Sequence, residues 1–161
     1  MKIFFSLVLF ISTLFSASYN FTEIRYSDAL ERSMELKGVI NLQSDGLIIK
    51  YKNSTKTIKY SDEEVEISED DELLELDSQE ATQLAQYFEL VLMLFNADTK
   101  TLSTEFEVSQ SHNKQTLIPI TQLSNYIEKI ELQREGSQLK TLQMFLSNGD
   151  NIKISIEDEV R

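Results

Sequence analysis

The feature that most limits how this 161-residue chain can fold is a series of short segments in which apolar and polar side chains alternate. A period of two indicates β-strands with one buried and one solvated face. Turn signals separate the segments, and Asp45-Gly46 and Asn148-Gly149 are typical of tight hairpins. Neighbouring strands should therefore pair antiparallel. Besides two short alternating stretches within residues 62–77, the predicted strands are residues 21–26, 39–43, 47–51, 57–60, 104–109, 115–120, 126–132, 139–146 and 151–156.

One long amphipathic helix is predicted over residues 77–96, in the middle of this series. Asp77 followed by Glu80 is the pattern of an N-terminal capping box. Residues 90–95 are apolar on every side, so this end of the helix must be covered on more than one face. The apolar stripe of the helix, spaced by four, three and four residues, is Leu84, Phe88, Val91 and Phe95.

The predicted strands place apolar side chains on one face of the sheet and charged side chains on the other. The apolar face is formed by Ile40, Leu42, Leu47, Ile49, Ile58, Tyr60, Phe106, Val108, Ile130, Leu132, Leu142, Met144, Ile152 and Ile154. An antiparallel sheet of eight or more strands with one apolar face curls, and one helix covers only part of what it encloses. We therefore expect an α+β fold, in which a strongly curved antiparallel sheet lies against one main helix.

The first residues have the pattern of a secretory signal peptide. Lys2 gives a basic start, residues 3–15 are mostly apolar, and residues 16–18 are small. The predicted cleavage point lies near Ala17. An uncleaved membrane anchor is the alternative, but thirteen residues are short of the roughly 20 that cross about 30 Å of hydrocarbon.

Removal of residues 1–17 leaves residues 18–161, which we expect to form a single domain. The chain has no cysteine, which excludes disulfides, thiolate zinc sites and cysteine nucleophiles. An exported chain without disulfides and with a short signal fits a bacterial periplasm. Loss of Lys2 takes the formal net charge from −12 to −13. Such a chain should bind no nucleic acid and should be repelled by anionic membrane surfaces.

Residues 62–77 are strongly acidic, with ten acidic side chains in sixteen positions. They could form a cation site or a docking face for a basic partner. They could equally be the solvated outer face of two strands, because Val65 with Ile67 and Leu74 with Leu76 keep the alternation. The stretch lacks the ligand spacing and glycine turn of a calcium loop, which favours the solvated face.

The sequence offers little support for catalysis, and we expect neither an enzyme nor a bound cofactor or metal. His112 is the one histidine and stands in a polar turn, residues 109–113, with no Gly-x-Ser-x-Gly elbow elsewhere. The acidic side chains alternate outwards, where nothing would perturb their pKa values. A small hydrolase acting on an acyl substrate is the weakest of the function classes considered.

Several segments occur in an order that is similar to that of a known family, although no single motif is diagnostic. These are Phe21-Thr22-Glu23-Ile24-Arg25, Gly38-Val39-Ile40, the alternating residues 47–51, Asn96-Ala97-Asp98 with Leu102 and Phe106, Leu117-Ile118-Pro119, residues 127–132 and Asn148-Gly149-Asp150. Over nearly all of residues 18–161 the chain resembles the outer-membrane lipoprotein carrier family, especially its smaller LolA-like branch.

The resemblance implies an unclosed half-barrel with helices as a lid over an apolar cavity. In that family the cavity binds the acyl chains of a lipoprotein that an inner-membrane complex releases. The carrier then transfers the lipoprotein to an outer-membrane acceptor. Typical carriers have an arginine that holds the lid shut, which we call the latch. Here Ser44-Asp45 falls at that place, so we expect a lid without a charged donor. The family's N-terminal helix is also expected to be missing or short.

The first functional hypothesis is a periplasmic, monomeric carrier that binds the acyl chains of lipoproteins, or another lipid, in an apolar cavity. An acyl chain of roughly sixteen carbons exposed to water costs on the order of 12 kcal/mol, so its transport requires such a cavity. The alternative is a periplasmic adaptor domain with a closed core that docks a basic partner through its acidic face. The candidate cavity residues are Ile40, Leu42, Leu47, Ile49, Ile58, Phe88, Leu92, Phe95, Phe106, Val108, Ile130, Leu132 and Met144.

Overall fold

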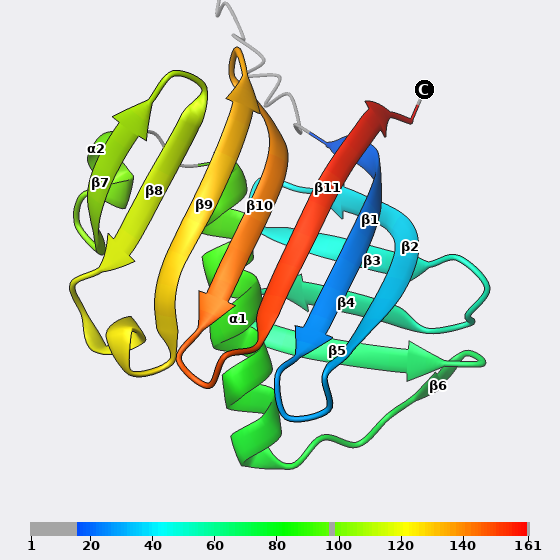
Figure 1. Ribbon diagram of the computed structural model, residues 1–161. Coiled ribbons are helices and arrows are strands. Elements are labelled where there is room, and N and C mark those ends of the chain that lie inside the picture. The colour runs from blue at the N-terminus through cyan, green and yellow to red at the C-terminus, as the bar shows by residue number, and fades with distance from the viewer. Residues whose placement is uncertain (1–15, 97–98, 161) are drawn as a thin grey trace, which may run out of the picture.

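The computed structural model describes residues 16–96 and 99–160, which form an eleven-stranded antiparallel sheet around one long helix (Figure 1). The strand order is β6-β5-β4-β3-β2-β1-β11-β10-β9-β8-β7, so the first and last strands of this order do not pair and the sheet is open. The expected α+β half-barrel is therefore confirmed. The strands are β1 (Ala17–Ser27), β2 (Arg32–Leu42), β3 (Gly46–Tyr51), β4 (Thr57–Ser61), β5 (Glu64–Glu69), β6 (Glu72–Leu73), β7 (Phe106–Ser111), β8 (Lys114–Pro119), β9 (Ile127–Glu135), β10 (Gln138–Leu146) and β11 (Asn151–Glu159).

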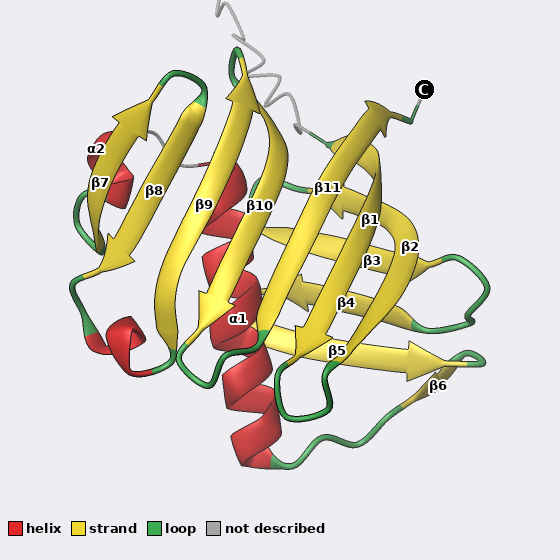
Figure 2. Cartoon of the chain, in the orientation of Figure 1, coloured by secondary structure: helices red, strands yellow, loops and turns green. Residues whose placement is uncertain are grey.

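The sheet consists of two meanders that meet in its middle. Strands β1 to β6 form one meander and β7 to β11 form the other, and each strand pairs with its neighbours along the chain. The pairing of β1 with β11 joins them, with Thr22 opposite Ser155 and Ile24 opposite Lys153. The helical segment lies between the two meanders in sequence and behind the sheet in space (Figure 2).

The long helix α1 (Ser78–Asn96) begins where the sequence predicts it. The Asp77 carboxylate accepts hydrogen bonds from the backbone amides of Gln79 and Glu80, both at 2.9 Å. These bonds satisfy two of the amides that a helix start leaves without partners. The two other helical elements are short, namely α2 (Thr99–Leu102) and the 3₁₀ turn η1 (Gln122–Asn125). Within the described part of the chain, no helix is long and apolar enough to cross a membrane.

Most predicted strands are confirmed, and two regions differ. Residues 27–37 show no clear pattern, but β2 already begins at Arg32 after a turn. Both strands expected within residues 62–77 are present, but the second, β6, covers Glu72–Leu73 and does not include the alternating Leu74 and Leu76. Asp70 and Asp71 form a tight turn with left-handed backbone, and after two paired residues the chain runs to the cap of α1 at Asp77.

The core lies between the inner face of the sheet and α1. Leu47, Leu94 and Ile130 have no solvent exposure. Gly38 makes close packing possible in the middle of β2, because a Cβ there would lie 2.5 Å from the Lys50 carbonyl oxygen and 2.8 Å from the Phe21 ring. Glycine is therefore required at this position by space rather than by backbone angle.

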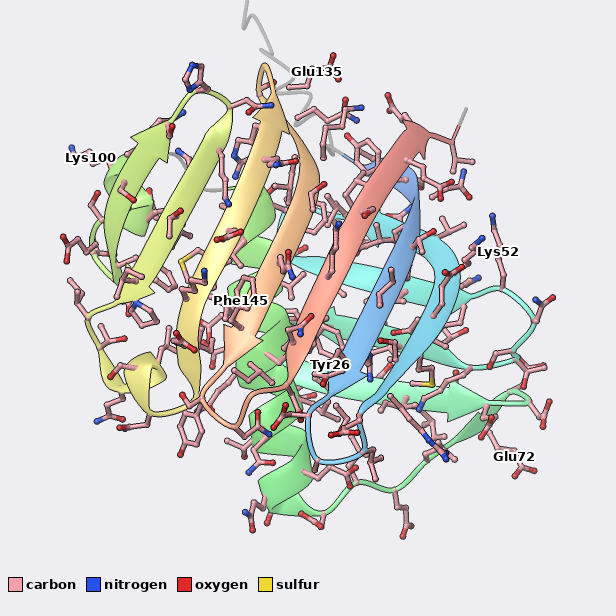
Figure 3. All side chains as sticks on the ribbon, viewed as in Figure 1. Tyr26, Lys52, Glu72, Lys100, Glu135 and Phe145 are labelled. Carbon is pink, nitrogen blue, oxygen red and sulfur yellow. The ribbon has the colours of Figure 1, made fainter. Side chains whose placement is uncertain are left out.

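The outer face of the sheet is polar with isolated apolar residues, as predicted. Figure 3 shows Tyr26 and Phe145 among its side chains. The Lys129 ammonium lies 4.4 Å from the centre of the Phe145 ring, a cation–π contact on this solvated side.

Candidate functional site

The candidate cavity residues come together between the inner face and α1, but in this conformation they form a packed core. Nine of the thirteen are buried, namely Ile40, Leu47, Ile49, Ile58, Phe88, Phe106, Ile130, Leu132 and Met144. Leu42, Leu92, Phe95 and Val108 are partly buried and pack against them. A space of only about 20 Å³ lies near the middle of α1, beside Phe88 and Val91. Binding of a ligand here would require α1 to move.

A larger cleft of about 530 Å³ lies at the C-terminal end of α1. We call it the end cleft. Leu42 and Phe95 line it and belong to the candidate cavity, so the end cleft meets the apolar inner face. The described residues that line it are all uncharged, namely Ala17, Tyr19, Leu42, Gln43, Ser44, Phe95, Asn96, Ser137, Gln138, Leu139 and Ile156.

Arg134 on β9 holds the end of α1 against the sheet. Its guanidinium Nη2 donates a hydrogen bond of 2.7 Å to the backbone carbonyl oxygen of Leu94, in the last turn of the helix. Its Nη1 lies 3.4 Å from the Ser137 carbonyl oxygen. A cation at a helix C-terminus also interacts favourably with the helix dipole. Burial lowers the pKa of Arg134, but arginine has so high a starting value that the side chain stays charged at neutral pH.

The expectation that the lid lacks a charged hydrogen-bond donor is wrong, because Arg134 donates to α1. Ser44 lies in the end cleft with Phe95 and Asn96, near the end of α1, as the resemblance implies. It is exposed, however, and its hydroxyl lies 3.4 Å from the carboxylate of Asp45. The charged donor comes instead from β9, ninety positions away in sequence, so comparison around residue 44 could not reveal it.

A polar cluster, which the sequence reasoning missed, lies beneath the middle of α1. Glu23 on β1 is only 3% exposed although it is a carboxylate. It accepts hydrogen bonds from the Arg25 guanidinium and, at 3.1 Å, from the Tyr51 hydroxyl. We call Glu23, Arg25 and Tyr51 the inner polar cluster. Period two places residues 21, 23 and 25 on one face, so the signal was present in the sequence.

Burial raises the pKa of the Tyr51 hydroxyl, and the nearby Glu23 carboxylate raises it further. The same two causes, burial first, raise the pKa of Tyr87 on α1. Both phenols therefore stay protonated, and the Tyr51 phenol can donate to Glu23. The charged pair Glu23 and Arg25 lies on the otherwise apolar inner face of the sheet, beneath the middle of α1.

The acidic side chains of residues 62–77 and His112 do not line the end cleft. Glu64 and Glu66 point to solvent from β5, and Lys59 pairs with Glu66 at 3.8 Å. His112 is exposed in the turn between β7 and β8. Within residues 16–96 and 99–160, no three potential metal-ligating side chains come together.

Comparison with known proteins finds similarity in solved structures alone. No protein-family model and no curated protein sequence matches the chain. A LolA superfamily protein from Nitrosomonas europaea aligns with 91% of this chain and 86% of its own, at 8% identity and a TM-score of 0.42. A domain assigned to outer membrane lipoprotein sorting, from Vibrio parahaemolyticus, aligns with 90% and 84%, at 8% identity and a TM-score of 0.43. Both matches agree with the family that the sequence resembles, but likeness at this level carries no argument about function.

Proposed function

We propose that the protein is a carrier that binds the acyl chains of a lipoprotein, or of another lipid, between α1 and the inner face of the sheet. The observation that supports this most is the open sheet, whose largely apolar inner face is interrupted by the inner polar cluster and is covered by a single long helix within the described residues. A lid of this kind can leave without breaking the sheet, since β1 to β11 pair with each other and not with α1.

The exchange of α1 for an acyl chain replaces one apolar contact with another. Phe88, Val91 and Leu94 now cover the inner face. A chain of roughly sixteen carbons would bury methylenes worth about 0.8 kcal/mol each, and this gain offsets the exposure of those side chains. The net affinity is then moderate, which suits a carrier that must release its cargo.

The end cleft is the proposed opening through which the acyl chain enters. It is the place where Leu42 and Phe95 of the candidate cavity already meet solvent-accessible space. The bond from Arg134 to Leu94 lies at the same end of α1, so this bond must break or shift when the lid opens.

Location and partners are part of the same proposal. The pattern of residues 1–17 supports export, although residues 1–15 lie outside the described part of the chain. β1 begins at Ala17, next to the proposed cleavage point. In the periplasm, an inner-membrane release complex would supply the cargo and an outer-membrane acceptor would receive it. N-terminal sequencing of the exported protein tests this, and an intact Met1 in a membrane fraction would contradict it.

Binding of a synthetic lipopeptide with one acyl chain of about sixteen carbons tests the carrier proposal directly. Phe95→Glu places a charge in the apolar wall of the end cleft and should weaken binding about tenfold or more. The matched control is Ile118→Glu, because Ile118 is 42% exposed on β8 and lies outside the end cleft. Native mass spectrometry of protein from its own cells would identify the bound lipid.

The same experiments separate the carrier from the alternative adaptor. A protein that folds but binds no lipopeptide, and that loses a basic partner at high salt, would contradict the carrier and favour the adaptor. Equal weakening by Phe95→Glu and Ile118→Glu would show that the end cleft is not the opening.

A further inference from the structure

Two grooves flank the exposed side of α1. The first lies between α1 and strands β4 and β5 and has a volume of about 540 Å³. The second lies between α1 and the η1 segment and has a volume of about 440 Å³. Gln86 and Glu89 line both, so the two meet on the helix. We call them together the flanking grooves.

Eight of the sixteen residues that line the flanking grooves are apolar, and we call these eight the floor. Tyr126 closes the second groove and is 73% exposed, an unusual position for a large aromatic side chain. Ala81, Ala85 and Met93 are only partly buried, and Ala85 and Met93 pack against the edge of the core, so each leaves some apolar surface in the grooves. The floor residues are Tyr60, Val65, Ala81, Ala85, Leu90, Met93, Leu123 and Tyr126.

The rim of the flanking grooves is acidic. It carries the carboxylates of Glu63, Glu64, Glu89 and Glu105, and no lysine, arginine or histidine among residues 16–96 and 99–160 lines either groove. None of the four is in an ion pair with a residue of the described chain. Burial raises the pKa of Tyr60 in the first groove, and Glu89 and Glu63 raise it further, which reflects the negative potential there.

We infer that the flanking grooves bind a cationic amphipathic helix of a partner protein, with its apolar side on the groove floor and its lysine or arginine side chains at the acidic rim. An apolar floor with a rim of one charge sign is complementary to such a helix. A net charge of −12 favours the same partner at long range. This partner would hold α1 from outside, whereas the cargo binds beneath it, so the surface goes beyond the proposed carrier function and does not depend on it.

A model peptide tests the inference on the full-length protein. The probe is a labelled amphipathic helix of leucine and lysine, about 18 residues long, and its control has glutamate in place of lysine. We expect the lysine peptide to bind, the glutamate peptide not to bind, and binding to fall at about 1 M salt, where the screening length is about 3 Å. Hydrogen exchange should slow in residues 81–93 and 121–126.

Substitutions at the rim identify the site. The double variant Glu64→Gln with Glu89→Gln should weaken peptide binding about 2- to 30-fold, since each exposed ion pair contributes a modest amount. The control, Glu72→Gln with Glu159→Gln, makes the same change in net charge at exposed residues outside both grooves.

Three results would overturn the inference. The first is no binding of the lysine peptide to the folded protein. The second is equal weakening by the two double variants, which would mean attraction by net charge alone. The third is self-association that Met93→Lys abolishes without any peptide binding, because the grooves would then bind a second copy. Lipopeptide binding is measured in parallel, so failure of the carrier proposal is seen separately.

Discussion

Replacement of Arg134 by methionine should loosen the end of α1 without unfolding the sheet. Methionine keeps an unbranched side chain of similar reach but removes the donor to the Leu94 carbonyl oxygen, now 2.7 Å away. The core beneath the rest of the helix is unchanged, since Phe88 and Val91 are buried by other residues. The perturbation is therefore local to the last turn of α1.

The size of the effect follows from the type of bond. A hydrogen bond from a charged donor contributes about 1.5–3 kcal/mol. Arg134 is partly exposed, so water can replace part of this interaction, and we expect a loss of about 1–2 kcal/mol in the free energy of local opening. At 25 °C that corresponds to a rise of about 5- to 30-fold in the population of the open helix end.

Hydrogen exchange measures this population directly, because amides in the last turn of α1 exchange when the turn opens. The matched control is Lys140→Met, which removes a cation from the same hairpin, where it pairs with Glu135 at 3.6 Å. Arg134→Met should speed exchange over residues 92–96 and increase hydrophobic-dye binding, and Lys140→Met should do neither. If the two variants exchange alike while both stay folded, Arg134 does not hold the helix end and the lid argument is wrong.

Three further predictions concern stability and pH. Hydrogen bonds from Lys114 and then Lys129 lower the pKa of Glu131 below 4.5, so this carboxylate stabilises the fold above that pH and loses its effect as the pH falls through its folded-state pKa. Glu131→Gln should lower the free energy of unfolding in urea by about 0.5–1.5 kcal/mol at pH 7. It should have no effect at pH values where Glu131 is protonated in the fold. An equal loss at both pH values would refute the ion pairs. The raised pKa of Tyr51 means that the contribution of this residue to stability is complete below pH 10 and falls above it, because Tyr51 ionises at a lower pH in the unfolded chain than in the fold. Tyr51→Phe should make this alkaline decline shallower in thermal melts, while an unchanged slope would show that another group causes it. Gly38→Ala should lower the free energy of unfolding by about 1–3 kcal/mol, because the alanine Cβ would lie 2.5 Å from the Lys50 carbonyl oxygen. An unchanged free energy of unfolding in denaturant titrations would contradict the close packing over Phe21.

Local patterns in the sequence predict most of the fold. The alternation of Leu47 to Tyr51 and the turn at Asn148-Gly149 act through neighbouring residues, as does the Asp77 cap, and each is confirmed. The alternation of Leu74 with Leu76 predicted the position of the second strand in residues 62–77 wrongly, because only Glu72 and Leu73 pair with β5.

The parts that sequence reasoning missed depend on contacts between distant segments. No local pattern shows that Arg134 reaches Leu94, forty positions away. The sequence could indicate one part of the inner polar cluster, because alternation places Glu23 on the inner face. Its hydrogen bond with Tyr51 depends on how the strands pair in the sheet, which spacing along the chain does not give. The candidate cavity residues lie together in the structure, and their role in binding a lipid stays a prediction. Their close packing under α1 depends on the position of the helix, which spacing in the sequence does not give.

The seam between β1 and β11 has a consequence for how the protein folds. Each meander can form from contacts close in sequence, but Thr22 and Ser155 must meet across 133 positions of the chain. Contacts of such separation carry a large loop-closure cost and form late. A chain that crosses a membrane with its N-terminus first would present β1 long before its partner arrives. Until then β1 can pair on one side only, with β2, and its other edge stays open to aggregation.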